Sequence, residues 1–247
     1  MKPGASQNRG RVRVEPGAKR VRAFLGGMPV ADTVHPLLVW EKPQYPAYYI
    51  PLGDVRSDLL VPTGTTTHSP SRGEASHFTV KTETEERIDA AWRYEASPIE
   101  ALRDHIRFDW DAMDAWFEED EEVFTHVRNP YTRVDILMSS RRVRVEADGV
   151  LLADSPHARV LFETGLPPRW YVPKVDVRMD LLVPSISSTQ CPYKGTAEYF
   201  SARLDDRVIE DAAWSYRTPL PESTKIAGLL SFYSHLVDVS VDGERLG

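Results

Sequence analysis

The chain has 247 residues, of which 41% are hydrophobic and 27% are charged, and its formal net charge is −7. This composition is typical of a globular protein, and the negative charge argues against nucleic acid as a partner because phosphate contacts need a basic face. No run of about 18 apolar residues is present, so we expect no membrane span.

The chain begins with a polar stretch, residues 1–10, which has no apolar segment of the kind that a secretory signal peptide carries. We predict a disordered lead-in there. The single cysteine excludes an internal disulfide and a multi-thiolate zinc site, and the seven histidines show no metal-ligand spacing. The sequence therefore predicts no metal and no cofactor, and it favours a cytoplasmic location.

One motif occurs twice at a fixed distance. The string DVRSDLLVP at 54–62 recurs as DVRMDLLVP at 176–184, and DAAWRY at 89–94 recurs as DAAWSY at 211–216. Farther along, the spacing between the copies grows by two residues, so that Phe108 aligns with Phe232 and Asp114 with Asp238. The chain is therefore a tandem repeat.

The first copy covers residues 11–122, a linker covers 123–129, and the second copy covers 130–247. A duplication this complete predicts two similar domains related by a pseudo-twofold axis, as in a monomer built like a fused dimer.

Short strands and turn residues dominate both copies. A helical turn is predicted at 97–100 and a second one at 222–227, whereas frequent prolines exclude long helices. In the second copy, residues 142–152 predict a hairpin around Asp148-Gly149. Further strands are expected at 160–162, 169–172, 198–202, 213–216 and 236–241. The predicted fold is mainly β, with small antiparallel domains.

The second copy contains an ordered set of motifs, which are LADS (152–155), FETGLPPRWYVP (162–173), DVRMDLLVPS (176–185), CPYKGTAEYF (191–200), DAAWSYRTPLPE (211–222) and FYSHLVDVSVDGE (232–244). In these motifs and their order it resembles the domain-of-unknown-function family numbered 427. The first copy keeps this order but has lost the CPYKG motif. The resemblance implies a β-tent-like fold, in which two antiparallel sheets meet at an angle. A nucleotidyltransferase-like label is attached to some members, but the sequence has no P-loop and no paired carboxylates in its better-kept copy.

The CPYKG turn contains the first candidate site. Lys194 lies three residues after Cys191, so it could stabilise a reactive thiolate or bind an anion. The alternative is a small buried cysteine beside a solvated lysine, and on either interpretation we expect Lys194 to be partly exposed. The first copy keeps the turn-forming proline and glycine but has Ser69 and Arg72 at these two positions, which favours function in the second copy.

Two further groups complete the candidate site. Glu163 and Arg169 bracket a proline-rich loop and could bind a polar ligand group or form a structural ion pair. Ala47 stands opposite Arg169, so a Glu–Arg pair is expected only in the second copy. The aromatic residues form a concave wall for a ligand or, alternatively, the core of the domain; they are Tyr171, Tyr193, Tyr199, Trp214 and Tyr216.

Three hypotheses follow from these patterns. The second copy binds an unknown small molecule, with a modest transfer through Cys191 as an extension. Alternatively, the protein is a non-catalytic interaction or scaffold module whose aromatic residues are core. A nucleotidyltransferase-like enzyme is the least favoured.

A separate charged set, Asp176, Arg178 and Asp180, alternates along a predicted strand in both copies. It is expected to be structural.

Overall fold

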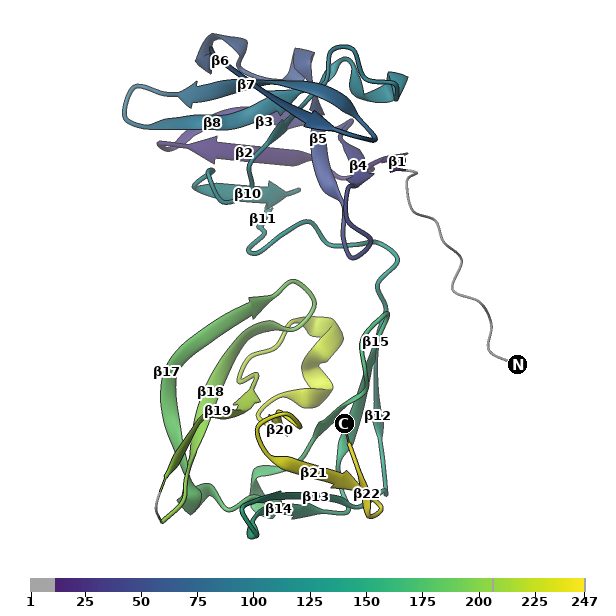
Figure 1. The fold of residues 1–247 in the computed structure, drawn as a ribbon, viewed down its shortest axis with the longest axis vertical. Coiled ribbons are helices and arrows are strands. Elements are labelled where there is room, and N and C mark those ends of the chain that lie inside the picture. Colours follow the sequence, from purple (N-terminus) through teal and green to yellow (C-terminus); the bar gives the residue numbers. More distant parts are fainter. Residues whose placement is uncertain (1–11, 206, 247) are drawn as a thin grey trace, which may run out of the picture. The chain divides into compact units, whose positions relative to one another are not determined.

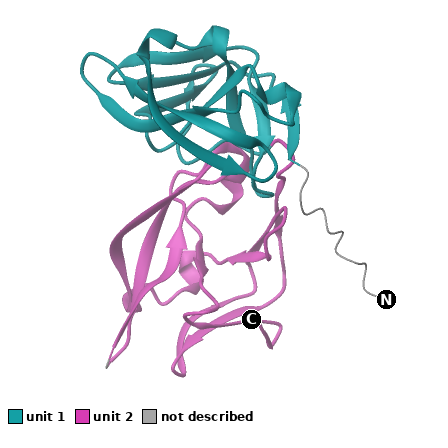
Figure 2. Ribbon diagram, turned by 45° about the horizontal axis from the view of Figure 1, so that its top comes forward, with its two compact units in different colours: residues 1–129 teal, residues 130–247 magenta. Residues whose placement is uncertain are grey.

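The computed structural model describes residues 12–205 and 207–246, and the predicted lead-in, residues 1–10, lies outside them. The chain divides into two compact units with the boundary between Asn129 and Pro130 (Figure 2). Each unit has its own buried apolar clusters. We call them unit 1 and unit 2.

Unit 1 contains short strands and single turns of 3-10 helix in the order β1 (Arg13–Pro16), β2 (Val21–Leu25), β3 (Met28–Thr33), β4 (Leu37–Trp40), β5 (Ala47–Pro51), η1 (Leu52–Asp54), η2 (Ser57–Leu59), β6 (Leu60–Ser69), β7 (Gly73–Lys81), β8 (Glu86–Arg93), η3 (Glu100–Leu102), β9 (His105–Phe108), β10 (Ala115–Glu118) and β11 (Glu121–Glu122).

Unit 2 repeats this order with β12 (Val134–Met138), β13 (Val143–Ala147), β14 (Val150–Ser155), β15 (Arg159–Glu163), β16 (Arg169–Tyr171), η4 (Lys174–Asp176), η5 (Met179–Leu181), β17 (Leu182–Cys191), β18 (Gly195–Arg203), β19 (Val208–Ser215), η6 (Pro221–Ile226), β20 (Leu230–Phe232), β21 (Asp238–Val241) and β22 (Glu244–Arg245). The structure therefore confirms a mainly β chain with two tandem copies of one domain.

The sheets of the two units have the same strand order. Unit 1 has the sheets β11-β10-β2-β3 and β1-β4-β5-β9-β8-β7-β6. Unit 2 has β14-β13-β21-β22, and its other strands form two sheets, β12-β15-β16 and β17-β18-β19-β20. The split arises because β5 pairs with β9 in unit 1, whereas only a single bridge between Val172 and Leu230 joins the equivalent strands in unit 2.

The three sheets of unit 2 surround a common interior. In Figure 1 the long β17–β18 hairpin lies on one side, β12 and β15 lie on the other, and β13, β14, β21 and β22 close one end. A large apolar cluster fills that closed end and includes Val145, Leu152 and Val239. A second cluster, which contains Tyr171 and Trp214, lies between the β12-β15-β16 and β17-β18-β19-β20 sheets.

The local turn predictions agree with the structure. Asp148 and Gly149 have φ angles of 50° and 79°, which is the left-handed pair that a two-residue hairpin turn requires. Short 3-10 helices stand at η3 and η6, where helical turns were expected. Just before η3, the Ser97 hydroxyl accepts the backbone N–H of Ile99 at 3.1 Å.

The end of the alignment needs a correction. Phe108 lies opposite Ala91 and Phe232 opposite Ala213, so these two phenylalanines are equivalent, as predicted. The alignment of Asp114 with Asp238 is wrong by one residue. Trp116 pairs with Ala23, whereas Val239 pairs with Val145, so Trp116 corresponds to Val239. The sequence alone lacked an identity in this region that would place the one-residue difference.

The charged set of Asp176, Arg178 and Asp180 does not lie on a strand. These residues belong to η4, η5 and the residues next to them, and Arg178 pairs with Asp180 on the surface. Asp176 points elsewhere and accepts the hydroxyl of Ser155 at 2.6 Å. The same hydroxyl accepts the backbone N–H of His157 at 3.1 Å, so Asp176 fixes the loop after β14.

We predict that Ser155→Ala lowers the free energy of unfolding of unit 2 by about 1 kcal/mol, because the Asp176 carboxylate and the His157 N–H both lose their partner. Ser155→Thr should retain most of the stability, since Thr33 makes the equivalent bonds to Asp54 and His35 in unit 1. Urea denaturation of the full chain measures both variants. Equal losses in the two variants would contradict the hydrogen-bonding role.

Candidate functional site

The CPYKG turn closes the β17–β18 hairpin. Cys191 lies opposite Gly195 in the strand register, and Gly195 has a φ of 92° that favours glycine. Ser69 and Gly73 form the same closed turn in unit 1, where Gly73 has a φ of 91°. The turn geometry is thus common to both copies, although the cysteine belongs to one. Cys191 is half-buried and packs against the apolar cluster between the two sheets.

Lys194 reaches from this turn to the end of β15, where its ammonium group pairs with Glu163. The side chains are only 11% and 10% exposed. The expectation of a partly exposed lysine is therefore wrong. The loop after β19 covers the turn: the Leu220 N–H donates to the Lys194 carbonyl at 3.1 Å, and the Ser223 hydroxyl donates to the Tyr193 carbonyl at 3.0 Å.

Four of the five predicted aromatic residues are buried together. Tyr171, Tyr199, Trp214 and Tyr216 are each at most 9% exposed, and with Tyr233 they form what we call the aromatic cluster. The Trp214 indole N–H donates to the Tyr171 hydroxyl at 3.1 Å, and the Trp214 and Tyr233 rings lie 4.3 Å apart. These contacts match the core alternative for the aromatic residues. Tyr193, the fifth residue, is half-buried in the CPYKG turn.

Burial controls the acid–base properties of these phenols. It raises the pKa of Tyr171 and of Tyr216 well above the ordinary value of 10.0, and the nearby Cys191 and Glu163 raise both further. Burial, together with the hydrogen bond to Tyr199, raises the pKa of Tyr233 to about 12. The cluster is therefore neutral at physiological pH, so it supplies packing and hydrogen bonds and no charge.

Arg169 does not join Glu163. Its guanidinium carbon lies 5.9 Å from the centre of the Trp214 ring, at the border of the aromatic cluster. Glutamate–arginine pairing instead occurs in unit 1, where Glu41 pairs with Arg107 and lies 3.8 Å from Arg72. The prediction that such a pair is confined to the second copy is therefore wrong, because the partner of Glu41 is Arg107 of β9 and not the residue equivalent to Arg169.

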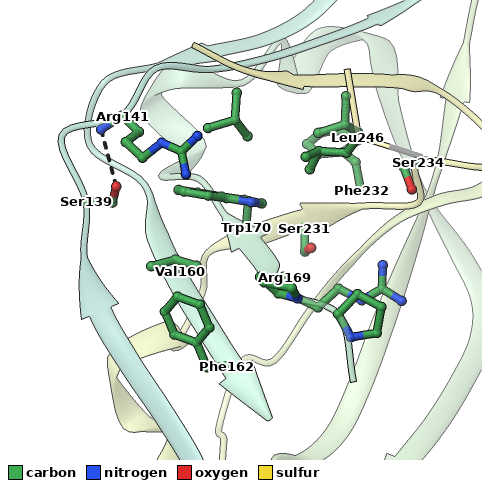
Figure 3. Close-up of a pocket in the computed structure, with 14 residues that line it drawn as sticks. Ser139, Arg141, Val160, Phe162, Arg169, Trp170, Ser231, Phe232, Ser234 and Leu246 are labelled. Atoms are coloured by element: carbon green, nitrogen blue, oxygen red, sulfur yellow. Dashed lines mark hydrogen bonds between the residues drawn. The ribbon is translucent and has the colours of Figure 1, made fainter. Parts of the chain in front are cut away.

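Arg169 also borders a pocket of about 430 Å³ in unit 2, which sequence reasoning missed. Its walls come from β15, β16, β20 and β21, with the Arg141 guanidinium over the Trp170 ring at 5.2 Å (Figure 3). The lining residues are Ser139, Arg141, Val160, Phe162, Pro167, Pro168, Arg169, Trp170, Ser231, Phe232, Ser234, Val239, Val241 and Leu246.

Larger side chains occupy two of the corresponding positions in unit 1. Val239 corresponds to Trp116, and Ser234, two residues after Phe232, corresponds to Trp110. These two indoles stack with ring centres 4.7 Å apart. The sequence shows valine and serine in unit 2 where unit 1 has two tryptophans. Only the corrected register shows that these two positions line the same pocket.

In unit 1, polar contacts also hold the side chains at the positions that line the pocket in unit 2. Glu118, the counterpart of Val241, accepts the Tyr48 hydroxyl at 2.8 Å and pairs with Lys19. Tyr48 in turn corresponds to Trp170 and lies against Trp116, with ring centres 6.4 Å apart. Unit 1 thus has packed side chains and a buried carboxylate where unit 2 has the pocket.

The comparisons with known proteins give a family. The model of the family described as Domain of unknown function (DUF427) matches residues 13–119 and again residues 135–243. The chain belongs to the DUF427 family. Two DUF427 domains therefore lie in tandem, one in each unit. No curated protein matches the chain.

Two further observations concern ligands and membranes. Within residues 12–205 and 207–246, no group of three or more His, Cys, Asp or Glu side chains is arranged to hold a metal ion. In the same residues, no helix is both long and apolar enough to cross a membrane.

We predict that Glu163→Gln and Lys194→Met each destabilise unit 2 by about 3 kcal/mol, because each leaves a buried charge without its partner. The double variant should recover much of this loss, since neither charge remains. Lys194→Arg should be tolerated, as Arg72 holds this position in unit 1. Chemical denaturation of the wild type and the four variants gives the coupling free energy between Glu163 and Lys194. Additive losses in the double variant would rule out a buried pair.

The raised tyrosine pKa values predict alkaline destabilisation. Unfolded chains deprotonate tyrosine near pH 10, whereas folded Tyr216 retains its proton, so its contribution is complete below pH 10 and is lost as the pH rises through the folded pKa. Between pH 10 and pH 11, the unfolding free energy of the wild type should therefore fall by about 1 kcal/mol more than that of Tyr216→Phe. Parallel pH profiles would contradict the burial of this hydroxyl.

Proposed function

We propose that unit 2 binds a small organic molecule in the pocket beside the aromatic cluster. The observation that carries the proposal is the contrast between the copies: the same framework is filled by Trp110, Trp116 and Glu118 in unit 1 and encloses about 430 Å³ in unit 2. That volume lies in the range of about 300–1,000 Å³ that is common for small-ligand sites.

The lining has the composition of a ligand site. Nine of its fourteen residues are apolar, among them the rings of Phe162, Trp170 and Phe232, and the others are serines and arginines. Ligand sites generally combine apolar walls with a few polar groups that orient the ligand. Burial of a flat apolar body against these walls supplies the affinity, at about 25 cal/mol per Å² of apolar surface removed from water.

The aromatic cluster adjoins this pocket through Arg169. Trp214 holds Tyr171 through a hydrogen bond and contacts Arg169, the residue that the cluster and the pocket share. Cys191 does not line the pocket, and Lys194 is committed to Glu163. The proposed function is therefore binding, with no chemical step assigned to Cys191.

A thermal-shift screen of the full chain against a metabolite library tests this proposal. A ligand that binds the folded chain raises its unfolding free energy by mass action, by about 2.7 kcal/mol at a ligand concentration of 100 times the dissociation constant. The melting temperature rises as a result. We predict that Ser234→Trp and Val239→Trp, which place the indoles of unit 1 in the pocket, abolish the shifts that wild type shows.

A matched control is His235→Trp, which adds the same ring at the next residue, where the side chain is exposed and outside the pocket. This variant should keep the ligand shifts. Circular dichroism establishes that all three variants are folded, and two filling positions guard against one of them failing to fold. Ligand shifts that persist in folded Ser234→Trp and Val239→Trp would refute the proposal, as would a library without any hit.

A further inference from the structure

The charges around the pocket identify the class of ligand, an inference that rests on the proposed function. Among the described residues, the lining contains two guanidinium groups, those of Arg141 and Arg169, and no carboxylate. A neutral apolar ligand would leave this positive potential unused, and a cationic ligand would be repelled by it.

Only one of the two guanidinium groups is neutralised. Arg141 donates to the Asp242 carboxylate at 2.7 Å and lies over the Trp170 ring. The Arg169 side chain contacts the Trp214 ring, but the described residues offer it no carboxylate and no hydrogen-bond acceptor. Trp214 thus holds Arg169 by a ring contact that leaves the five N–H donors of the guanidinium available.

The backbone fixes where this cation stands. Arg169 is the first residue of β16, directly after Pro167 and Pro168, and its backbone pairs with Leu161 of β15. The two prolines restrict the chain that leads into the strand. Ser231 on the neighbouring strand β20 also lines the pocket and provides a hydroxyl donor.

We infer that the pocket takes a monocarboxylate with a flat apolar body, whose carboxylate binds Arg169 and whose body packs between Trp170 and Phe232. The planar guanidinium fork matches the two oxygens of a carboxylate. One unpaired positive charge matches one negative charge. A dianionic phosphate would leave a second negative charge in a largely apolar pocket, where an unpaired charge is costly.

Unit 1 is not equipped for the same ligand. Ala47 stands in place of Arg169, and Arg107, the counterpart of Ser231, is already paired with Glu41. Each chain should therefore bind one carboxylate, in unit 2.

The experiment compares matched probes by isothermal titration calorimetry on the full chain at neutral pH. Benzoate, 2-naphthoate and hexanoate are each paired with the amide of the same body, and 2-naphthyl phosphate is the dianionic member. In wild type, at least one carboxylate should bind more tightly than its amide by about tenfold or more, the scale of hydrogen bonds to a charged group. It should bind at one site per chain.

The variants separate the two proposals. Arg169→Gln should remove the preference for the carboxylate while the amide keeps its affinity, and Arg217→Gln, an exposed arginine of unit 2, should change neither. Ser234→Trp should abolish binding of both members of the pair. Equal affinity for carboxylate and amide, a preference that survives Arg169→Gln, or tighter binding of the phosphate would overturn the monocarboxylate inference and leave the pocket standing. If none of the probes binds to wild type, the monocarboxylate inference fails. The metabolite screen with the Ser234→Trp and Val239→Trp variants then tests separately whether the pocket binds a small molecule.

Discussion

In each unit, a largely buried glutamate at the end of one strand pairs with a cation from a distant part of the chain. In unit 2, Glu163 at the end of β15 receives Lys194 from the tip of the β17–β18 hairpin. Two buried charges of this kind are costly alone and acceptable together, so the hairpin must close onto β15 for either charge to be tolerated. The position of the hairpin in turn determines where Tyr199 lies, and thereby the arrangement of the aromatic cluster.

The two units keep this constraint and differ in how they satisfy it. Glu41 in unit 1 pairs with Arg107, lies near Arg72 and accepts the Tyr49 hydroxyl at 2.6 Å. In unit 2 the tyrosine equivalent to Tyr49 is Tyr171, which accepts the Trp214 N–H instead. Among the described residues, Lys194 balances Glu163 without a second cation, so the position of Arg107 is free to be a serine, Ser231, which lines the pocket. A change in the ion pair therefore accompanies the appearance of the pocket.

The sequence predicted the fold well because the fold depends on features that a repeat makes visible. The Asp148-Gly149 turn and the helical turns follow from local residue chemistry, and the presence of two tandem copies follows from the repeated motifs. The Asp176 region was predicted as a strand because its residues alternate, but they lie in 3-10 turns whose geometry is fixed by a long-range bond to Ser155. Alternation of polar and apolar residues does not distinguish these cases.

The candidate site was harder to predict, since a pocket is a property of residues from several strands. Sequence reasoning assembled Glu163, Lys194 and the aromatic residues, and the structure brings them together, but as a closed and largely neutral cluster. The pocket depends instead on what is missing at Ser234 and Val239 relative to Trp110 and Trp116, a difference that requires the correct register of β21.

A duplicated domain separates stability from function in a way that a single domain does not. Residues that both units share, such as the turn glycines and the buried acid at 41 and 163, are explained by the fold, because each copy must close the same sheets. Residues that differ at equivalent interior positions have no such common explanation. The loss of two indoles and of a buried carboxylate would normally cost unit 2 several kcal/mol of packing. The pocket of unit 2 is left open at that cost, and beside it lies Arg169, which pairs with no carboxylate among the described residues. A small molecule that fills the pocket best explains both features.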